Sequence, residues 1–324
     1  MKIKRILSIV LAGLLMFSAM MLTSCKDDGK YNVGVIQLVT HDALDAATEG
    51  FVQALKDKLG EENVVIDIQN AANSPDTCAT IANSFVNQKV DLIMANATPA
   101  LQAAYSATLS IPILGTSVTE YGVALGIENF SGTVGGNVSG TSDLASLESQ
   151  AQMILDLFPE TKTVGMLYCS SEPNSDYQVK KVAEYLTAKN IVCNNYEFSD
   201  SNDVSTVTQK AAAECDVIYV PTDNTAAACA ETIYGAMGNN KKPIIAGEAG
   251  ICSGCGVATL SISYYDLGYR TGEMAAQILT GEADISTMPI AYAPQETKKY
   301  NAAICEDLGI NVENLEAKGY VALD

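Results

Sequence analysis

The segment DVIYVPTDNTAAA (216–228) repeats the pattern of DLIMANATPALQAA (91–104). Each segment begins with Asp, runs through four apolar residues, breaks at a polar cluster and resumes as an Ala-rich stretch. A short apolar run predicts a buried strand, and the Ala-rich stretch after the polar break predicts a helix. The sequence therefore indicates that one strand–loop–helix unit is built twice, about 125 residues apart.

The repeat extends through most of the chain. NVGVIQLVTHDALDAATEGFVQAL (32–55) matches TVGMLYCSSEPNSDYQVKKVAEYL (163–186), and IPILGTSVTE (111–120) matches KPIIAGEAGI (242–251). Strands that alternate with helices predict parallel sheets covered on both faces, and such strands are continuously apolar. The expected strand cores have this character: Val33–Ile36, Leu92–Met94, Val164–Leu167 and Val217–Val220. We therefore predict an α/β fold of two Rossmann-like lobes.

The chain order predicts three crossings between these lobes. GNVSGTSD (136–143) lies between the two repeats, 256–279 reads as a strand and a long helix, and 288–310 supplies a last crossing. The predicted first lobe comprises residues 31–139 and 262–290, and the predicted second lobe comprises residues 140–261 and 291–324.

The N-terminus has the pattern of a secretory leader. Three basic residues precede an apolar run, and the run ends in Leu22-Thr23-Ser24-Cys25, which resembles a bacterial lipobox. We expect residues 1–24 to be a signal peptide, Cys25 to carry a lipid, and residues 25–30 to be a tether. The alternative, a short transmembrane anchor, does not account for Cys25. The expected location is the outer face of the bacterial cytoplasmic membrane.

The charge balance disfavours two classes of partner. The chain has 38 acidic and 19 basic residues, and removal of the leader takes away three of the basic ones, which leaves 16 − 38 = −22. So acidic a protein is a poor ligand for nucleic acid or for anionic lipid.

Cysteine spacing does not favour a metal site. Cys252 and Cys255 form a CxxC pair, but the chain has no second such pair and its one histidine, His41, is distant in sequence. A local disulfide or two free thiols remain open, and an exported redox enzyme is a minor alternative. We expect no metal, no cofactor and no catalytic residue.

The loops after the expected strands hold the candidate ligand-binding residues. In open parallel sheets the binding crevice lies at the carboxyl ends of the strands. The six loops there contain seven carboxylates but no Lys or Arg, which disfavours phosphate and dicarboxylate ligands. A zwitterion fits this mix: helix starts at Thr98 or Ser175 would hold its carboxylate, and Asp223 and Glu172 would hold its ammonium. For Asp42, Asp45 and Asp176, helix capping is an equal alternative.

Together, HDALDAATEGF, ATPALQAA, SGTSD, YVPTDNT and SYYDLGYRTGEMAAQIL resemble the type 1 periplasmic-binding-protein lipoproteins of ABC transporters, in the group similar to tryptophan- and tyrosine-binding members. The resemblance covers about residues 31–300 and implies a Venus-flytrap clamshell that docks on a membrane permease and binds a small molecule. The candidate site residues from both approaches are Leu44, Asp45, Thr98, Thr116, Ser117, Thr141, Ser142, Glu172, Asn174, Ser175, Asp223, Asn224 and Glu248.

Two departures from the family pattern affect the ligand. Asp42 stands where the family commonly has Pro, and Glu248 lies in a loop, 247–250, that is commonly Asp-rich. We predict an amino acid, with an aromatic side chain favoured by the resemblance, and no catalysis. A sugar or nucleoside binder on the same fold, used for transport or for sensing, is the main alternative. Candidate rings for stacking on the ligand are Tyr105, Tyr121, Tyr168 and Tyr264.

Overall fold

The computed structural model describes residues 29–293 and 295–323. The predicted leader and Cys25 lie outside these residues, as does most of the tether. In the part of the chain that is described, we find no helix with both the length and the apolar character needed to cross a membrane.

The first sheet has six parallel strands in the order β11-β5-β4-β3-β1-β2. Its strands are β1 (Tyr31–Gln37), β2 (Val64–Asn70), β3 (Leu92–Asn96), β4 (Ile113–Val118), β5 (Val138–Ser142) and β11 (Ala291–Tyr292). Helices α2 (Asp42–Leu59) and α12 (Tyr264–Leu279) pack on one face of this sheet, and Phe51 and Met274 belong to the hydrophobic core between the helices and the sheet. Helices α3 (Pro75–Gln88) and α4 (Thr98–Ala107) cover the other, over Phe85 and Leu101. Short elements α5 (Tyr121–Leu125), η1 (Glu61–Asn63) and η2 (Ile285–Thr287) complete this region.

The second sheet has seven strands in the order β13-β12-β10-β9-β8-β6-β7. Its strands are β6 (Thr163–Cys169), β7 (Val192–Phe198), β8 (Val217–Val220), β9 (Ile244–Ala246), β10 (Ala258–Ser261), β12 (Thr297–Tyr300) and β13 (Val321–Ala322). One face carries α6 (Leu147–Leu157) and α7 (Pro173–Ala188), and the other carries α8 (Val204–Glu214), α10 (Ala230–Ala236) and α11 (Ala249–Cys255). The remaining helices are α9 (Asn224–Ala228), α13 (Ala302–Asp307) and α14 (Val312–Glu316).

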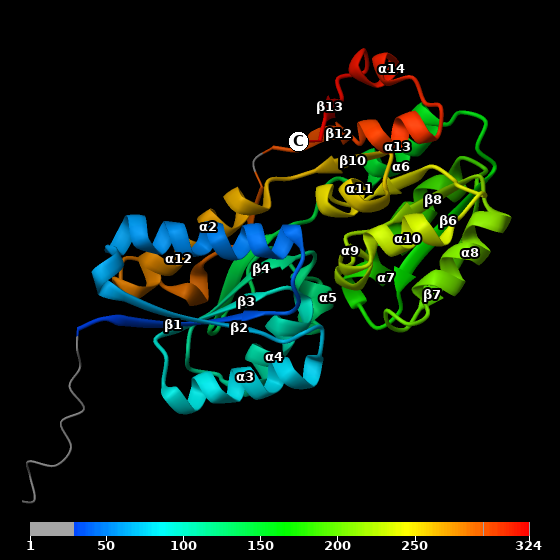
Figure 1. Cartoon of the computed structure of the whole chain (residues 1–324). Helices are drawn as coiled ribbons and strands as arrows, with labels where there is room; N and C mark the ends of the chain where they lie inside the picture. Colours follow the sequence, from blue (N-terminus) through cyan, green and yellow to red (C-terminus); the bar gives the residue numbers. More distant parts are fainter. Residues whose placement is uncertain (1–28, 294, 324) are drawn as a thin grey trace, which may run out of the picture.

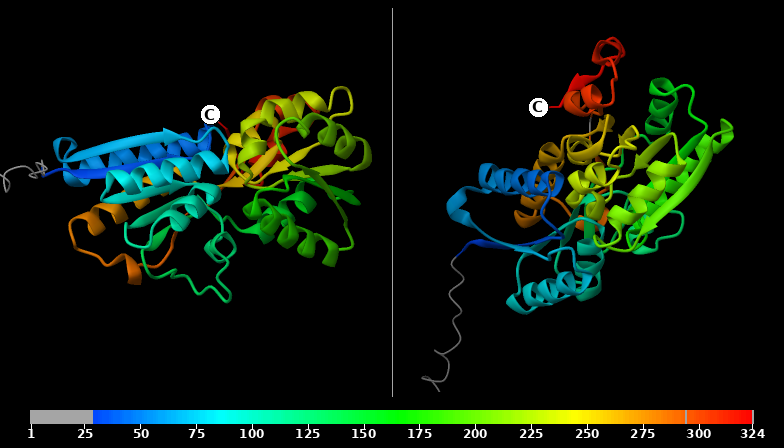
Figure 2. Two further views of the ribbon diagram at one scale, coloured as in Figure 1. Left: turned by 90° about the horizontal axis from the view of Figure 1, so that it is seen from below. Right: turned by 45° about the vertical axis from the view of Figure 1, so that its right-hand side comes forward.

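The two sheets repeat one topology. The order β5-β4-β3-β1-β2 in the first corresponds, strand for strand, to β10-β9-β8-β6-β7 in the second. The predicted two-lobed α/β fold is therefore confirmed, and the lobes lie side by side in Figures 1 and 2. One detail differs from the expectation of parallel sheets: β12 runs antiparallel to β10, because the chain enters the second lobe from the first at that point.

The described chain passes between the sheets after β5, after β10 and after β11. After β10 it continues into α12, which packs against α2 in the first lobe (Figure 1). This helix pair is close because Gly268 has no Cβ, which would otherwise lie 1.9 Å from the Ala47 carbonyl oxygen. Strand β5 of the first sheet ends at residue 142, and β11 of the same sheet lies at 291–292. The first sheet therefore extends a few residues beyond the predicted ends of the first-lobe segments, 139 and 290. The full lobe boundaries stay a prediction.

Candidate ligand-binding cavity between the lobes

A cavity lies between the two lobes, where the carboxyl ends of their strands face each other. Its empty volume, which includes space open to solvent, is about 280 Å³ and lies below the range of roughly 300–1,000 Å³ for small-molecule sites. Its lining comes from both lobes and from the start of α12: His41, Ala43, Leu44, Ser117, Thr119, Asp143, Asn174, Thr222, Asp223, Asn224, Ala227, Glu248 and Tyr264. No Lys or Arg is among these residues, as the sequence predicted for the strand-end loops.

The lobes touch each other next to this cavity. The side-chain nitrogen of Asn73, before α3, donates a hydrogen bond of 3.0 Å to the hydroxyl oxygen of Thr225, in α9. Burial on both sides of the boundary is extensive, since Leu44 is 1% exposed and Asp223 is also 1% exposed. The two lobes therefore enclose the cavity.

Four buried polar atoms without a hydrogen-bond partner belong to side chains that line this one cavity. They are His41 Nε2, Ser117 Oγ, Asp143 Oδ1 and Asn174 Oδ1. Buried polar groups in proteins are nearly always paired, and leaving one unpaired costs about 1–3 kcal/mol. Such atoms at one place indicate a site whose hydrogen bonds are completed by a polar ligand.

Ser117 reaches the cavity through an irregularity in β4. Its φ of 53° lies in the left-handed region, and the register of β4 against β5 shifts between Gly115 and Val118. A bulge of this kind redirects a side chain at the end of a strand. The Asp143 backbone nitrogen donates to the Val118 carbonyl at 3.4 Å, so Ser117 and Asp143 lie on neighbouring strand ends.

Asp143 is a buried carboxylate with one free oxygen. Its Oδ2 accepts a hydrogen bond of 2.9 Å from the Tyr264 hydroxyl, while its Oδ1 is unpaired. Burial raises the pKa of Asp143, and the hydroxyls of Tyr264 and Thr119 partly offset that rise. Sequence reasoning did not select Asp143, because it follows β5 in a crossing segment and its partner Tyr264 is 121 residues away.

Glu248 is a second buried carboxylate at this end of the cavity. Its two oxygens accept hydrogen bonds from the backbone nitrogens of Ile251 and Gly250, which caps the start of α11. Burial raises its pKa to about 7, and the charges of Asp42 and Asp143 add to that rise. Asp143 and Glu248 are therefore two buried acids that line the same cavity, called here the acidic pair, and no Lys or Arg lines the cavity to balance their charge.

The two acids predicted to hold an ammonium, Glu172 and Asp223, are both engaged by donors of the protein. Glu172 accepts hydrogen bonds of 3.0 and 2.9 Å from the backbone nitrogens of Asn224 and Thr225, and two more from their side chains. Asp223 accepts from the backbone nitrogens of Ala226 and Cys169, both at 2.7 Å. Burial and the nearby charge of Glu172 raise the pKa of Asp223. These acids hold the start of α9 against α7 and β6.

Six of the predicted site residues line the cavity: Leu44, Ser117, Asn174, Asp223, Asn224 and Glu248. Glu172 and Ser175 are buried directly behind it, beside Asn174.

Four other candidates are buried in the first lobe and do not line the cavity: Thr98, Thr116, Thr141 and Ser142. Thr116, Thr141 and Thr271 form a chain of hydroxyl contacts, and Ser142 donates to the Thr119 carbonyl. Thr98 is the first residue of α4 rather than its cap, which is Ala97.

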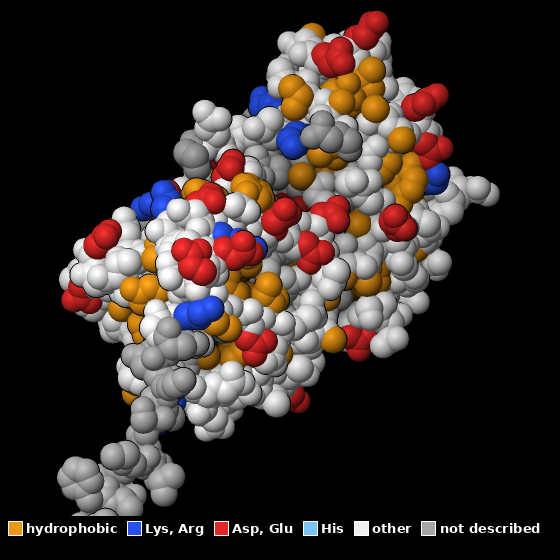
Figure 3. Space-filling view, turned by 60° about the vertical axis from the view of Figure 1, so that its left-hand side comes forward, with side chains coloured by type: hydrophobic (Ala, Val, Ile, Leu, Met, Phe, Trp, Pro, Cys, Tyr) orange, Lys and Arg blue, Asp and Glu red, His pale blue; other side chains and the backbone are white. Residues whose placement is uncertain are grey.

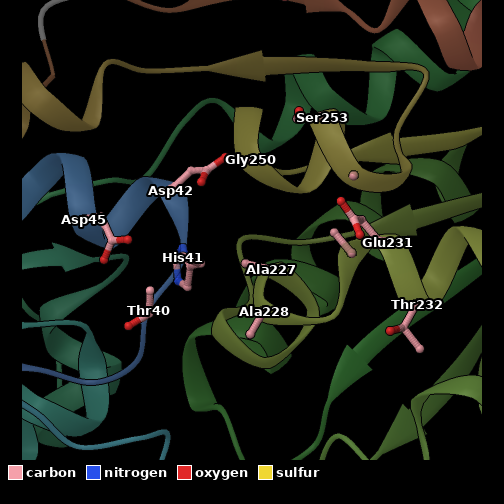
Figure 4. A pocket seen from close by; sticks show the side chains of 12 residues that line it. Thr40, His41, Asp42, Asp45, Ala227, Ala228, Glu231, Thr232, Gly250 and Ser253 are labelled. Carbon is pink, nitrogen blue, oxygen red and sulfur yellow. The ribbon is translucent and has the colours of Figure 1, made fainter.

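Asp45 and His41 line a second, outer pocket at the edge of the same cleft. Figure 4 shows it between the start of α2 and the helices of the second lobe, with Asp42 pointing toward Gly250. His41 lines both this pocket and the inner cavity, so its imidazole stands between them. Asp45 is held on the first lobe by a hydrogen bond of 2.6 Å from the Gln37 side chain.

Of the four tyrosines predicted as candidates for stacking on the ligand, one lines the cavity. Tyr121 and Tyr168 belong to the cores of the two lobes, and Tyr105 is 38% exposed. Only Tyr264, of these four, lines the cavity.

The CxxC thiols are buried and unbonded to each other. Cys252 and Cys255 are both free, and burial raises the pKa of each thiol. A reactive thiol needs the opposite, a lowered pKa and access to solvent.

The described residues contain no group of three metal-ligating side chains. Acidic side chains are prominent on both lobes in Figure 3.

Comparison with known proteins agrees with this architecture. Two α/β lobes of this repeated topology with a cavity between them have the architecture of the type 1 periplasmic-binding fold, whose members bind ligands between their lobes. Residues 32–318 match the family model for ABC transporter substrate binding proteins. The chain is 39% identical over 306 residues to a tyrosine-binding protein of Clostridioides difficile (strain R20291), covering 89% of this chain and 88% of that protein. The chain belongs to the ABC transporter substrate-binding protein family.

Two solved structures show the state of the lobes. A Streptococcus pneumonia ABC domain in complex with L-Trp has a TM-score of 0.85 at 30% identity, covering 90% of this chain and 99% of that one. A ligand-free, open substrate-binding protein with adhesive properties from Clostridium difficile has a TM-score of only 0.69 at 37% identity, covering 91% and 99%. The arrangement of the lobes here is therefore more similar to that of the L-Trp complex than to that of the ligand-free, open protein.

Proposed function

We propose that this chain is an extracytoplasmic, lipid-anchored binding protein that delivers an aromatic amino acid to an ABC importer. The observation that carries the proposal is the cavity between the lobes. Four of its polar atoms have no hydrogen-bond partner, and its two buried acids have no Lys or Arg beside them in the lining. The names of relatives that bind tyrosine or contain bound tryptophan support the ligand class. The role is binding and release, without chemistry on the ligand.

Asp143 is the proposed hydrogen-bonding partner of the ligand's ammonium, because the oxygens of Glu248, like those of Glu172 and Asp223, already accept hydrogen bonds from backbone nitrogens. Asp143 Oδ1 is free to accept, and the nearby Glu248 adds a second negative charge. This replaces Glu172 and Asp223, whose oxygens already accept hydrogen bonds from backbone nitrogens. A buried ammonium–carboxylate pair with hydrogen bonds is strongly favoured over either ion alone.

Ser117 is the proposed partner of the ligand's carboxylate. Its unpaired hydroxyl is free to donate, and it lies on the strand end next to Asp143. In an α-amino acid the ammonium and the carboxylate are bonded to the same carbon atom, so the side chains that bind them must be neighbours. The side chain of the ligand then extends over the apolar lining of Ala43, Leu44 and Ala227.

Membrane attachment and the permease partner complete the proposal. The lipobox-like ending at Cys25 supports a lipid anchor, with residues 26–30 as a polar tether. A family member of this kind hands its ligand to permease subunits in the membrane. The acidic surface argues against nucleic acid as a partner.

A ligand panel tests the function. We expect thermal shift and calorimetry to show stabilisation by an aromatic amino acid and none by sugars or nucleosides, since a ligand that binds only the folded state raises the melting temperature. Asp143→Asn should weaken amino acid binding by roughly 100-fold or more, because it leaves a buried ammonium without its counter-charge. Asp42→Asn, in the outer pocket, removes the same charge and is the matched control. Stabilisation by a sugar and by no amino acid would contradict the proposal.

A further inference from the structure

Leu109 is the most exposed large apolar side chain in the part of the chain that the structure describes. It is 83% exposed, whereas the next, Tyr292, is 56% exposed. Leu109 lies in the loop between α4 and β4, and residues 107–112, ATLSIP, include no Asp, Glu, Lys or Arg. A single exposed apolar residue is ordinary on a protein surface. Its significance here depends on how the loop is held and on where it lies.

Hydrogen bonds hold the backbone on both sides of Leu109. The Thr108 hydroxyl oxygen accepts from the backbone nitrogens of Ser110 and Ile111, each at 3.2 Å. The side-chain nitrogen of Asn137 donates to the carbonyl oxygens of Thr108 and Ile111, at 3.1 and 2.8 Å. The loop therefore has a fixed shape that displays Leu109 to the outside. A side chain presented on an ordered backbone loses less conformational freedom when it binds a partner.

This loop lies at the end of the first sheet where the described chain begins. Strand β1 starts at Tyr31, it pairs with β3, and β3 pairs with β4, all in parallel. The loop before β4 therefore lies at the same end of the sheet as the start of β1. Two strand spacings separate β1 from β4, which is roughly 10 Å.

The proposed lipid anchor keeps this end of the first lobe close to the membrane. Cys25 precedes Tyr31 by six residues, and a chain of that length spans at most roughly 20 Å. Under the proposed function Cys25 lies at the membrane surface. The start of β1 then stays within that distance of the lipid, and the Leu109 loop is beside it.

We propose that the loop 107–112 is a membrane-contact loop that places Leu109 in the lipid bilayer next to the anchor. The inference rests on the lipid anchor of the proposed function. A Leu side chain gains free energy when it leaves water for the boundary of the acyl chains. The protein as a whole is strongly acidic, so an uncharged loop is a part of the surface that anionic headgroups do not repel. The contact adds a second attachment point and limits rotation of the first lobe about its tether.

Tryptophan fluorescence tests the contact, because the chain contains no Trp of its own. The lipid-modified full-length protein is reconstituted into phosphatidylcholine vesicles with brominated acyl chains, which quench a Trp that they touch. We expect Leu109→Trp to lose fluorescence and to shift to shorter wavelength. Val192→Trp, at a position 55% exposed at the start of β7 in the second lobe, is the matched control and should change in neither respect.

A second pair of variants separates the native side chain from the membrane affinity of the introduced Trp. Ser110→Trp keeps Leu109 and should also be quenched. Adding Leu109→Ser to Ser110→Trp should relieve that quenching. All three positions are exposed, so folding does not depend on them.

Vesicle flotation distinguishes this inference from the anchor on which it rests. Protein that floats with the vesicles while Leu109→Trp stays unquenched would overturn the membrane-contact loop and leave the anchor intact; the exposed Leu109 would then be free for a protein partner such as the permease. Equal quenching of Leu109→Trp and Val192→Trp would overturn it as well, since adsorption would be unspecific. Protein that does not float would overturn the lipid anchor and the contact together.

Discussion

Glu248 should make the stability of the ligand-free protein fall as the pH rises. Its carboxyl is 3% exposed, and burial raises its pKa from an ordinary value of 4.5 to about 7. Between these two values the folded chain holds a proton that the unfolded chain has released. The stabilising contribution is therefore fully present below pH 4.5 and is lost as the pH rises through 7.

The magnitude follows from the size of the pKa change. At 1.36 kcal/mol per pKa unit, a rise from 4.5 to about 7 corresponds to about 3 kcal/mol in the free energy of unfolding. Roughly 2 to 3 kcal/mol of this falls between pH 5 and pH 8. The raised pKa values of Asp143 and Asp223 act in the same direction, so the unmodified protein should show a larger total decrease.

Urea unfolding followed by circular dichroism, on protein dialysed free of ligand, measures this effect. Glu248→Gln has no proton to bind, so its stability should fall by about 2 to 3 kcal/mol less than that of the unmodified protein between pH 5 and pH 8. Glu49→Gln, on the exposed side of α2, is the control and should follow the unmodified protein. Parallel pH curves for Glu248→Gln and the unmodified chain would refute the reasoning.

Three further predictions concern other contacts. Glu172→Gln should lower the free energy of unfolding by about 3 kcal/mol and speed amide exchange in α9, because its carboxylate satisfies two backbone nitrogens there. Asn73→Ala should enlarge the ligand-free protein in X-ray scattering, through loss of a hydrogen bond between the lobes, and change unfolding by only about 1 kcal/mol. Half-buried Cys193 and Cys229 should react first with a thiol reagent, whereas Cys252 and Cys255 should react only in urea.

The fold was accessible from the sequence because the chain carries the same pattern twice. Buried parallel strands such as β3 and β8 are continuously apolar, and helices follow them at similar spacing in both halves. Strand order within each sheet then repeats as well. What the pattern did not predict was the antiparallel pairing of β12 with β10, since strand direction there depends on the path of the chain through the other lobe.

The candidate site was accessible only in part, because composition cannot show where a carboxylate's hydrogen bonds go. Glu172 and Asp223 lie in the right loops, yet their oxygens accept from backbone nitrogens around α9. Asp143 lies in a crossing segment outside the loops that the repeat singled out, and its importance depends on Tyr264, which only the fold brings near. Ser117 faces the cavity through a local bulge that no periodicity reveals.

The charge of the cavity gives a physical reason for coupling ligand capture to lobe closure. With the lobes together, Asp143 and Glu248 are removed from water and no Lys or Arg lines the cavity, so closure without ligand leaves them either protonated or without a counter-charge. Opening restores their hydration, which favours the open state when they are ionised. Under the proposed function the ligand's ammonium supplies the missing positive charge only when the lobes are closed around it. A neutral ligand of the same shape does not remove this cost, so the acidic pair selects for an amine as well as orienting it.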